Sequence, residues 1–239
     1  MTRRTTIDPT TSAPTGRDAG APVPASAGLP GPDGRRRPRL VLVGGVPGAG
    51  KSTALARVAT AVPAVRVLDS ESARERLRSR LPGAPYPLLR PVVHAWHAVR
   101  VLGAVLHVRG APRGSDGPPE ASEPPTLLVH DPATRRWRRV ALALLARACG
   151  WSPVLVVLDV GLDDARRGQQ ERGRVVRGRA FTRHWRRYQA QRPRLVRASE
   201  AGVASGGWDG VHVVDRRSAP TVLASLVGRP SRPEAGARP

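Results

Sequence analysis

The sequence has little of what would place a protein outside the cell or in a membrane. Cys149 is the only cysteine among 239 residues, so no internal disulfide can form and a reducing compartment is expected. Arg3 and Arg4 are followed by no apolar run, which argues against a secretory signal. The longest apolar stretch, residues 91–108, contains three histidines and Arg100, and is too short and too polar to span a bilayer. We therefore expect a cytoplasmic protein without a membrane span.

Asparagine is absent, and Lys51 is the only lysine among 40 basic residues. Guanine-specific switch proteins recognise their base with an Asn/Thr-Lys-x-Asp segment, whereas Lys51 lies in a glycine-rich loop. The sequence therefore disfavours a GTPase of that kind.

Acidic residues are few compared with arginine, and the formal net charge is +22. A charge of this size attracts polyanions such as nucleotides, nucleic acid or anionic lipid surfaces. The alternative is a solvated arginine-rich surface, because part of the arginine excess is typical of a coding bias.

The chain divides into one folded unit and two tails. Residues 1–38 and 229–239 are rich in small residues and proline without any period, and are expected to be disordered. Residues 109–125 have a similar composition and predict a mobile loop. The folded domain should span residues 39–228.

Short apolar blocks alternate with helical patterns through this domain. We expect strands near residues 40–43, 65–68, 126–129, 154–158 and 211–214. The predicted helices are near residues 51–62, 70–80, 89–107, 137–148, 182–198 and 219–227, and a further helix begins at about residue 163 and leads into the arginine-rich segment. This alternation predicts an α/β fold with a mainly parallel five-stranded sheet and helices on both faces. Ligands of such sheets bind beyond the carboxyl ends of the strands, where Gly45, Asp69, Asp131 and Asp159 follow the apolar blocks.

The most specific motif is a glycine loop that matches the pattern G-x-x-x-x-G-K-[ST]. Its glycines let main-chain amides surround a phosphate, Lys51 would reach the β- and γ-phosphates of ATP, and Ser52 would ligate Mg²⁺. The broad guanidinium of arginine would not fit where this single lysine lies. The residues expected to hold the nucleotide are Gly45, Val46, Pro47, Gly48, Ala49, Gly50, Lys51, Ser52 and Thr53.

The third strand ends in His130-Asp131-Pro132 and lacks the Asp-Glu pair with which ATP-hydrolysing machines activate water. No Leu-Ser-Gly-Gly-Gln segment of the transporter type is present either. Both absences favour transfer of phosphate to an acceptor over motor-like hydrolysis.

Together, the loop, Asp69-Ser70, residues 129–131 and the segment 158–187 resemble the small P-loop kinases. These include gluconate-kinase-like, polynucleotide-kinase-like and zeta-toxin-like members. Across residues 39–228 the sequence looks most similar to uncharacterised actinobacterial proteins called AAA family ATPases.

The resemblance implies roles for two carboxylates. Asp69 matches the residue that takes the proton of the acceptor hydroxyl, although it or Ser70 can instead cap the following helix. Asp131 matches a position that holds Mg²⁺, with an Asp-Pro turn as the alternative. We interpret Asp159 as a structural residue that closes the fourth strand.

Ten arginines and no acidic residue lie between Arg172 and Arg197. In P-loop kinases this position belongs to a mobile lid, here near residues 172–182, that brings guanidinium groups to the triphosphate. The expected donors are Arg172, Arg174, Arg177 and Arg179. Alternatively, the segment is a solvated face, or it follows a nucleic-acid backbone while Trp185 and Tyr188 stack on bases. We favour packing of these two aromatic rings in the core.

The sequence therefore predicts an ATP- and Mg²⁺-dependent kinase that acts on an unidentified small-molecule or polyanionic hydroxyl acceptor. An ATPase or regulatory ATP-binding module without transfer is one alternative, and a nucleic-acid-binding NTPase is another. Neither the acceptor nor the oligomeric state can be read from the sequence.

Overall fold

A computed structural model describes residues 37–63, 65–81, 86–110, 125–131, 134–171 and 178–228. Its five strands are β1 (Arg39–Gly45), β2 (Arg66–Leu68), β3 (Thr126–His130), β4 (Ser152–Leu158) and β5 (Gly210–Val214). They form one sheet in the order β2-β3-β1-β4-β5, and every pair is parallel. This confirms the parallel five-stranded sheet. The predicted tails, most of the 109–125 loop and the first half of the lid lie largely outside the described residues.

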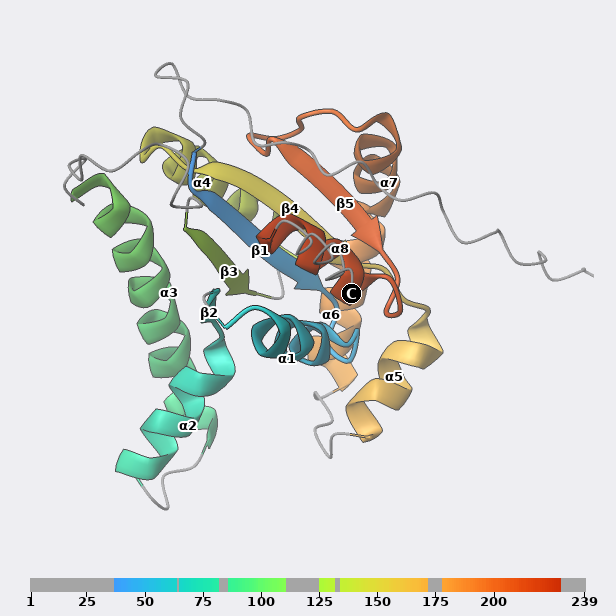
Figure 1. The fold of residues 1–239 in the computed structure, drawn as a ribbon. Coiled ribbons are helices and arrows are strands. Elements are labelled where there is room, and N and C mark those ends of the chain that lie inside the picture. The colour runs from blue at the N-terminus through green and yellow to red at the C-terminus, as the bar shows by residue number, and fades with distance from the viewer. Residues whose placement is uncertain are drawn as a thin grey trace, which may run out of the picture.

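The described helices are α1 (Lys51–Ala61), α2 (Ser70–Arg80), α3 (Tyr86–Gly110), α4 (Arg136–Ala148), α5 (Leu162–Gln170), α6 (Gly178–Gln189), α7 (Arg192–Ala201) and α8 (Ala219–Val227). In Figure 1, α1 and α8 pack together in front of the sheet, while α4 and α7 lie behind β4 and β5. Helix α3 flanks the β2 edge, beside α2. The expectation of helices on both faces is confirmed.

The central strands explain why this sequence forms a sheet. β1 and β4 are neighbours, and both are continuous apolar runs whose side chains are buried on the two faces. The register pairs Val43 with His130 on one side and with Val156 on the other, and Leu68 with Val129. The ends of β1, β2 and β3 therefore lie at the same level, so residues that follow them meet at one edge.

The single helix predicted over residues 182–198 is wrong, because α6 and α7 are separate helices joined at Ala190 and Gln191. Pro193 lies in the first turn of α7, where its missing N–H is no loss. Inside a continuous helix the same proline would remove a hydrogen bond and clash with the preceding turn. Pro193 is therefore the signal that divides the segment.

Helix α3 is longer than predicted, and it includes Arg109 and Gly110, which the sequence assigns to the mobile loop. In the described part of the chain, no helix combines the length and the apolar character that crossing a membrane requires.

Candidate functional site

The glycine loop connects β1 to α1 in a backbone conformation that favours glycine. Gly45, Gly48 and Gly50 have φ angles of 138°, 85° and 98°, all in the region that side chains rarely adopt. Val46 and Ala49 are fully buried and secure the loop to the core. Gly50 caps α1 without any side-chain hydrogen bond, and no acidic residue lies in the first turn. The positive end of this helix therefore faces the loop without a competing carboxylate.

Two of the loop glycines also lie against neighbouring main chain. A Cβ atom on Gly48 would come within 1.9 Å of the carbonyl oxygen of Ala165 in α5, and one on Gly45 within 2.8 Å of that of Leu158. Arg216, just after β5, donates from Nη2 to the carbonyl of Gly48 at 2.8 Å and to that of Asp164 at 3.1 Å. The loop is thus held by α5 and by the β5–α8 turn.

Lys51 is the first residue of α1, and only 6% of it is exposed. Its ammonium group donates to the carbonyl oxygens of Gly45 and Val46, both at 2.9 Å. The side chain therefore bends back over the loop rather than into solvent. Because its charge also lowers the pKa of Asp69, Lys51 lies within electrostatic reach of the end of β2.

The two residues expected at the metal are Ser52 and Asp131. Ser52 follows Lys51 in α1 and is half-buried, and Thr53 is exposed. Asp131 follows β3, and its main-chain N–H donates to the carbonyl of Val43 in β1 at 3.3 Å. Strand β1 connects the two expected metal residues, because it leads through the loop to Ser52 and pairs with β3, which Asp131 follows.

Asp69 and His130 form a pair that the sequence did not reveal. Asp69 follows β2 and His130 ends the adjacent strand β3, and Nδ1 of His130 lies 2.5 Å from Oδ1 of Asp69. Burial raises the pKa of Asp69, but the hydrogen bond from His130 and the charges of His130, His97 and Lys51 outweigh it and lower this pKa. Asp69 is therefore a carboxylate near neutral pH, and Nδ1 of His130 is the donor.

A second histidine, His97 in α3, belongs to the same electrostatic group. Burial lowers its pKa, the negative charges of Asp131 and Asp69 raise it, and the charge of His130 lowers it further. The net shift is downward, so His97 is a neutral imidazole. Within the described residues, neither of its ring nitrogens has a hydrogen-bond partner.

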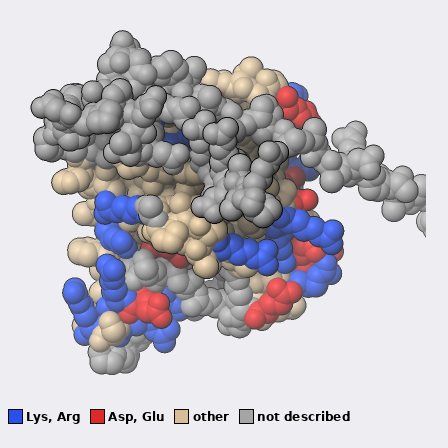
Figure 2. Space-filling model, in the orientation of Figure 1, with Lys and Arg blue, Asp and Glu red and all other residues tan. Residues whose placement is uncertain are grey.

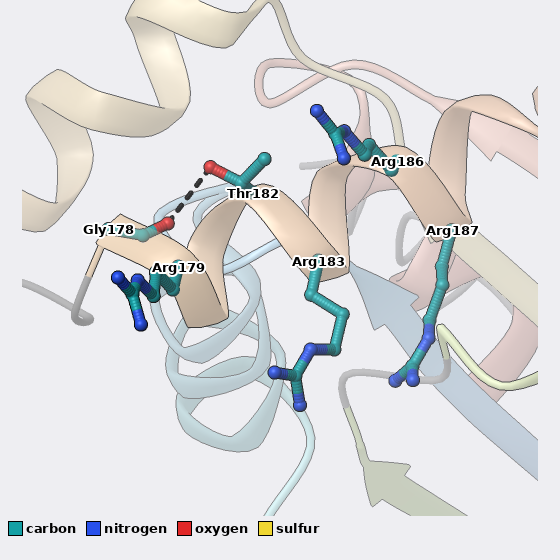
Figure 3. Close-up of a pocket in the computed structure, with 6 residues that line it drawn as sticks. All are labelled: Gly178, Arg179, Thr182, Arg183, Arg186 and Arg187. Carbon is teal, nitrogen blue, oxygen red and sulfur yellow. Dashed lines mark hydrogen bonds between the residues drawn. The ribbon is translucent and has the colours of Figure 1, made fainter.

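Of the four arginines expected in the lid, the structure describes Arg179 alone, since Arg172, Arg174 and Arg177 lie outside the described residues. Arg179 lies in the first turn of α6 and lines an open cavity of about 540 Å³ with five other residues of that helix. These are Gly178, Thr182, Arg183, Arg186 and Arg187. In Figure 3, Arg183 and Arg187 extend from one side of α6, and Arg186 extends from another. Helix α6 thus presents a basic face.

The opposite face of α6 packs into the core beside the end of β4. Tyr188 is buried and donates its hydroxyl to Asp159 at 2.8 Å, and Trp185 stacks on Phe181. Arg192 forms an ion pair with the same carboxylate at 2.7 Å. Core packing of the two aromatic residues and the structural role of Asp159 are confirmed. The ring of Tyr188 is buried, and that of Trp185 is partly buried against the core.

Positive charge also lies near the predicted site on the side that Figure 2 shows. There, Lys and Arg side chains lie over α2 and around α5, interspersed with Asp and Glu side chains, and both elements flank the carboxyl end of the sheet.

Comparison with protein-family models and with curated proteins found no match. Among solved structures, a candidate kinase from Chloroflexus aurantiacus is 15% identical with a TM-score of 0.43, over 57% of this chain and 69% of that one. A protein of the PezAT chromosomal toxin–antitoxin system of Streptococcus pneumoniae is 15% identical with a TM-score of 0.42, over 57% and 53%. The tunicamycin resistance protein of Deinococcus radiodurans is 16% identical with a TM-score of 0.44, over 80% and 96%.

Similarities of this size assign no activity, and none of these three is described as an AAA family ATPase, so that part of the resemblance stays a prediction. The fold follows from the geometry of the molecule itself. A parallel sheet with the order β2-β3-β1-β4-β5, and a glycine loop between β1 and α1, is an α/β P-loop fold.

Proposed function

We propose that the protein transfers the γ-phosphate of ATP, with Mg²⁺, to a hydroxyl group of an acceptor. The observation that carries this proposal is the Asp69–His130 pair, at 2.5 Å, within electrostatic reach of Lys51. It brings an ionised carboxylate near the residue expected to contact the phosphates. A simple nucleotide-binding module does not need such a carboxylate.

The part of the proposed site that would bind the nucleotide is formed by the glycine loop and the start of α1. Residues 45–53 would surround the phosphates with main-chain amides, and the positive end of α1 would favour their charge. Lys51, which bonds loop carbonyls at 2.9 Å, would turn to the β- and γ-phosphates. Arg216, which donates to the carbonyl of Gly48 at 2.8 Å, would support the loop from the other side.

The metal would be held by Ser52 and Asp131, which are half-buried oxygen donors of the kind that Mg²⁺ prefers. Bound Mg²⁺ offsets the charge of the phosphate oxygens. The hydrogen bond from the Asp131 main chain to Val43 fits this role, because it holds Asp131 next to the strand that leads into the loop.

On the acceptor side, Asp69 would orient the hydroxyl and take its proton late in the transfer. His130 would keep the carboxylate in place through Nδ1. Arg179, together with Arg172, Arg174 and Arg177, would stabilise the charge on the transferring group. Helix α6 supports this role, because its inner face is packed into the core and its outer face is basic.

The basic face of α6 also supports the second candidate, a nucleic-acid-binding NTPase. Arg179, Arg183, Arg186 and Arg187 line one cavity, and within the described residues none of them forms an ion pair with a carboxylate. Such a face attracts a phosphate backbone without sequence preference. Trp185 stacks on Phe181 and Tyr188 bonds Asp159, so these interactions do not support the stacking of bases that this candidate function would use.

The deciding experiment is transfer from γ-labelled ATP to pooled metabolites, oligonucleotides and aminoglycosides. We expect Asp69→Asn to reduce transfer by a factor of about 10² to 10⁴ while ATP affinity stays near that of the wild type. Asp163→Asn, which changes an exposed carboxylate paired with Arg166 in α5, is the matched control and should retain activity.

Full activity of Asp69→Asn would remove this residue from the mechanism. Release of ADP without any labelled product would instead favour the ATPase or regulatory alternative. Labelling of oligonucleotides alone would favour a nucleic-acid substrate.

A further inference from the structure

Helix α3 has an exposed apolar face that the proposed function does not use. Its inner face belongs to the core through Val101 and Val105, whereas five large apolar side chains of its outer face are each between 43% and 61% exposed. These are Val92, Trp96, Val99, Leu102 and Leu106. A helix that is apolar on all sides is normally covered on all sides, and a contiguous exposed apolar patch marks an interaction surface.

The outer face of α3 is also free of fixed charge. Over residues 91–107, every exposed residue is nonpolar or a histidine, and the one arginine, Arg100, is half-buried. Copies of a chain with a net charge of +22 repel one another over much of their surface. The outer face of α3 is therefore a place where two copies can meet without bringing like charges into contact.

Small residues complete this face. Ala95 and Gly103 are exposed and lie on the same side of α3 as the five large side chains. At 3.6 residues per turn, the seven positions fall within an arc of about 120° centred on Val99, and they extend about 21 Å along the helix. An arc of this width is typical of a helix face that packs against another element.

The seven positions are symmetric about Val99, so the face is complementary to itself. In an antiparallel pair of α3 helices with a two-fold axis at Val99, each position before this residue meets the position equally far after it in the other copy. Ala95 then meets Gly103 of the other copy, which lets the two helices approach closely. Large side chains likewise meet large ones, namely Trp96 with Leu102 and Val92 with Leu106.

We propose that the protein forms a two-fold symmetric homodimer through the outer face of α3. Half-exposed side chains of these sizes offer roughly 300 Å² of apolar surface per copy. Since about 60% of an interface is apolar, the pair would bury roughly 1,000 Å² in total. This area is at the lower limit of a specific interface, so the dimer should be reversible, with a Kd in the micromolar range.

The test is sedimentation velocity of the full chain at concentrations from about 1 to 200 µM. We expect an equilibrium between monomer and dimer. Raising the salt from about 0.1 to 0.5 M should shift it toward the dimer, because salt screens the repulsion between two basic chains. Association through opposite charges would instead weaken with salt, and this result would contradict the proposal.

Val99 is the residue to change, because it would face its own copy on the two-fold axis. Val99→Glu and Val99→Lys each bring two like charges into contact, so each should raise the Kd of the dimer at least about 100-fold. A mixture of the two variants should form dimers again, because opposite charges then face each other. Since Val99 is exposed in the single chain, both variants should fold like the wild type.

The matched control is Val203→Glu, which changes a valine of similar exposure just after α7, away from the outer face of α3. This variant should dimerise like the wild type. A wild-type protein that stays monomeric over the whole range would overturn the proposal and indicate that another segment of this chain or a different protein covers α3. Dimers that persist in each Val99 variant alone would also overturn it, since the contact would then lie elsewhere. A mixture that stays monomeric would contradict the two-fold axis at Val99.

Discussion

The two halves of the candidate site are built by different parts of the chain. On the nucleotide side the main chain determines the shape, since loop glycines lie against the carbonyls of Leu158 and Ala165. On the acceptor side the shape comes from side chains, because Asp69 follows β2 and is hydrogen-bonded to His130 at the end of β3. The first half requires a conformation that glycine alone adopts easily, whereas the second requires particular functional groups.

This difference predicts which substitutions affect nucleotide binding and which affect phosphate transfer. Changes to loop glycines should reduce nucleotide binding and stability together. Changes to the acceptor side should reduce transfer while ATP binding persists.

The largest expected effect is that of Gly48→Ala. The added Cβ would approach the Ala165 carbonyl oxygen to 1.9 Å, and φ is +85°, so the backbone must move. We expect a loss of about 3 kcal/mol or more in the free energy of unfolding, and an ATP affinity reduced by at least about 10-fold. Denaturant unfolding and calorimetry would measure these two losses.

Gly150→Ala separates the cost of the backbone angle from that of the contact. Gly150 has the same φ of +85°, but a Cβ there has no atom within 4 Å. Its substitution should cost only about 1 kcal/mol. Equal losses in the two variants would contradict the close approach of the loop to α5.

A smaller effect is expected from His130→Ala on the acceptor side. Removal of the hydrogen bond leaves the half-buried carboxylate of Asp69 without this donor, which should cost about 1 to 2 kcal/mol of stability. Transfer should fall, but the affinity for ATP should stay within about 2-fold of the wild type. A large loss of ATP affinity would show that the two halves are not separate.

The pH dependence of unfolding gives a second measurement on this pair. Because the pKa of Asp69 in the folded protein is below its ordinary value of 3.8, its contribution to stability is present above that pH and is lost as the pH falls through the folded value. In His130→Ala this pKa should rise, so that the variant loses stability at a higher pH than the wild type. Parallel stability curves for the two proteins would contradict the pairing.

The smallest effect should come from the turn that supports the loop. Oδ1 of Asp215 accepts hydrogen bonds from the main chain of Arg217 at 2.9 Å and Ser218 at 2.7 Å, and this turn carries Arg216 to the Gly48 carbonyl. Asp215→Ala should cost about 1 kcal/mol and weaken ATP binding only about 2- to 3-fold. An unchanged ATP affinity would mean that Arg216 does not support the loop.

Most of the fold could be predicted because its signals are local. The buried strands β1 and β4 are continuous apolar runs, and the glycine loop lies between a strand and a helix. The division between α6 and α7 was missed because the arginine-rich pattern continues through Pro193, whose effect on the backbone outweighs it.

The acceptor side was harder to predict. Asp69 was singled out by its place after a strand, but its pairing with His130 depends on the register of β2 and β3, which are 61 residues apart at this contact. His97 belongs to an apolar stripe of α3 and has no motif around it. Arg216 is one arginine among many. Its contact with Gly48 depends on folding over 168 residues.

The most direct test of the account is isothermal titration calorimetry of the full chain with ATP and Mg²⁺. We expect saturable binding by the wild-type protein and a loss of at least about 100-fold in affinity for Lys51→Ala, because its buried ammonium group lies over the loop. Absence of binding heat with ATP and every other nucleoside triphosphate, or equal affinities of the two proteins, would contradict the claim that this loop binds a nucleotide.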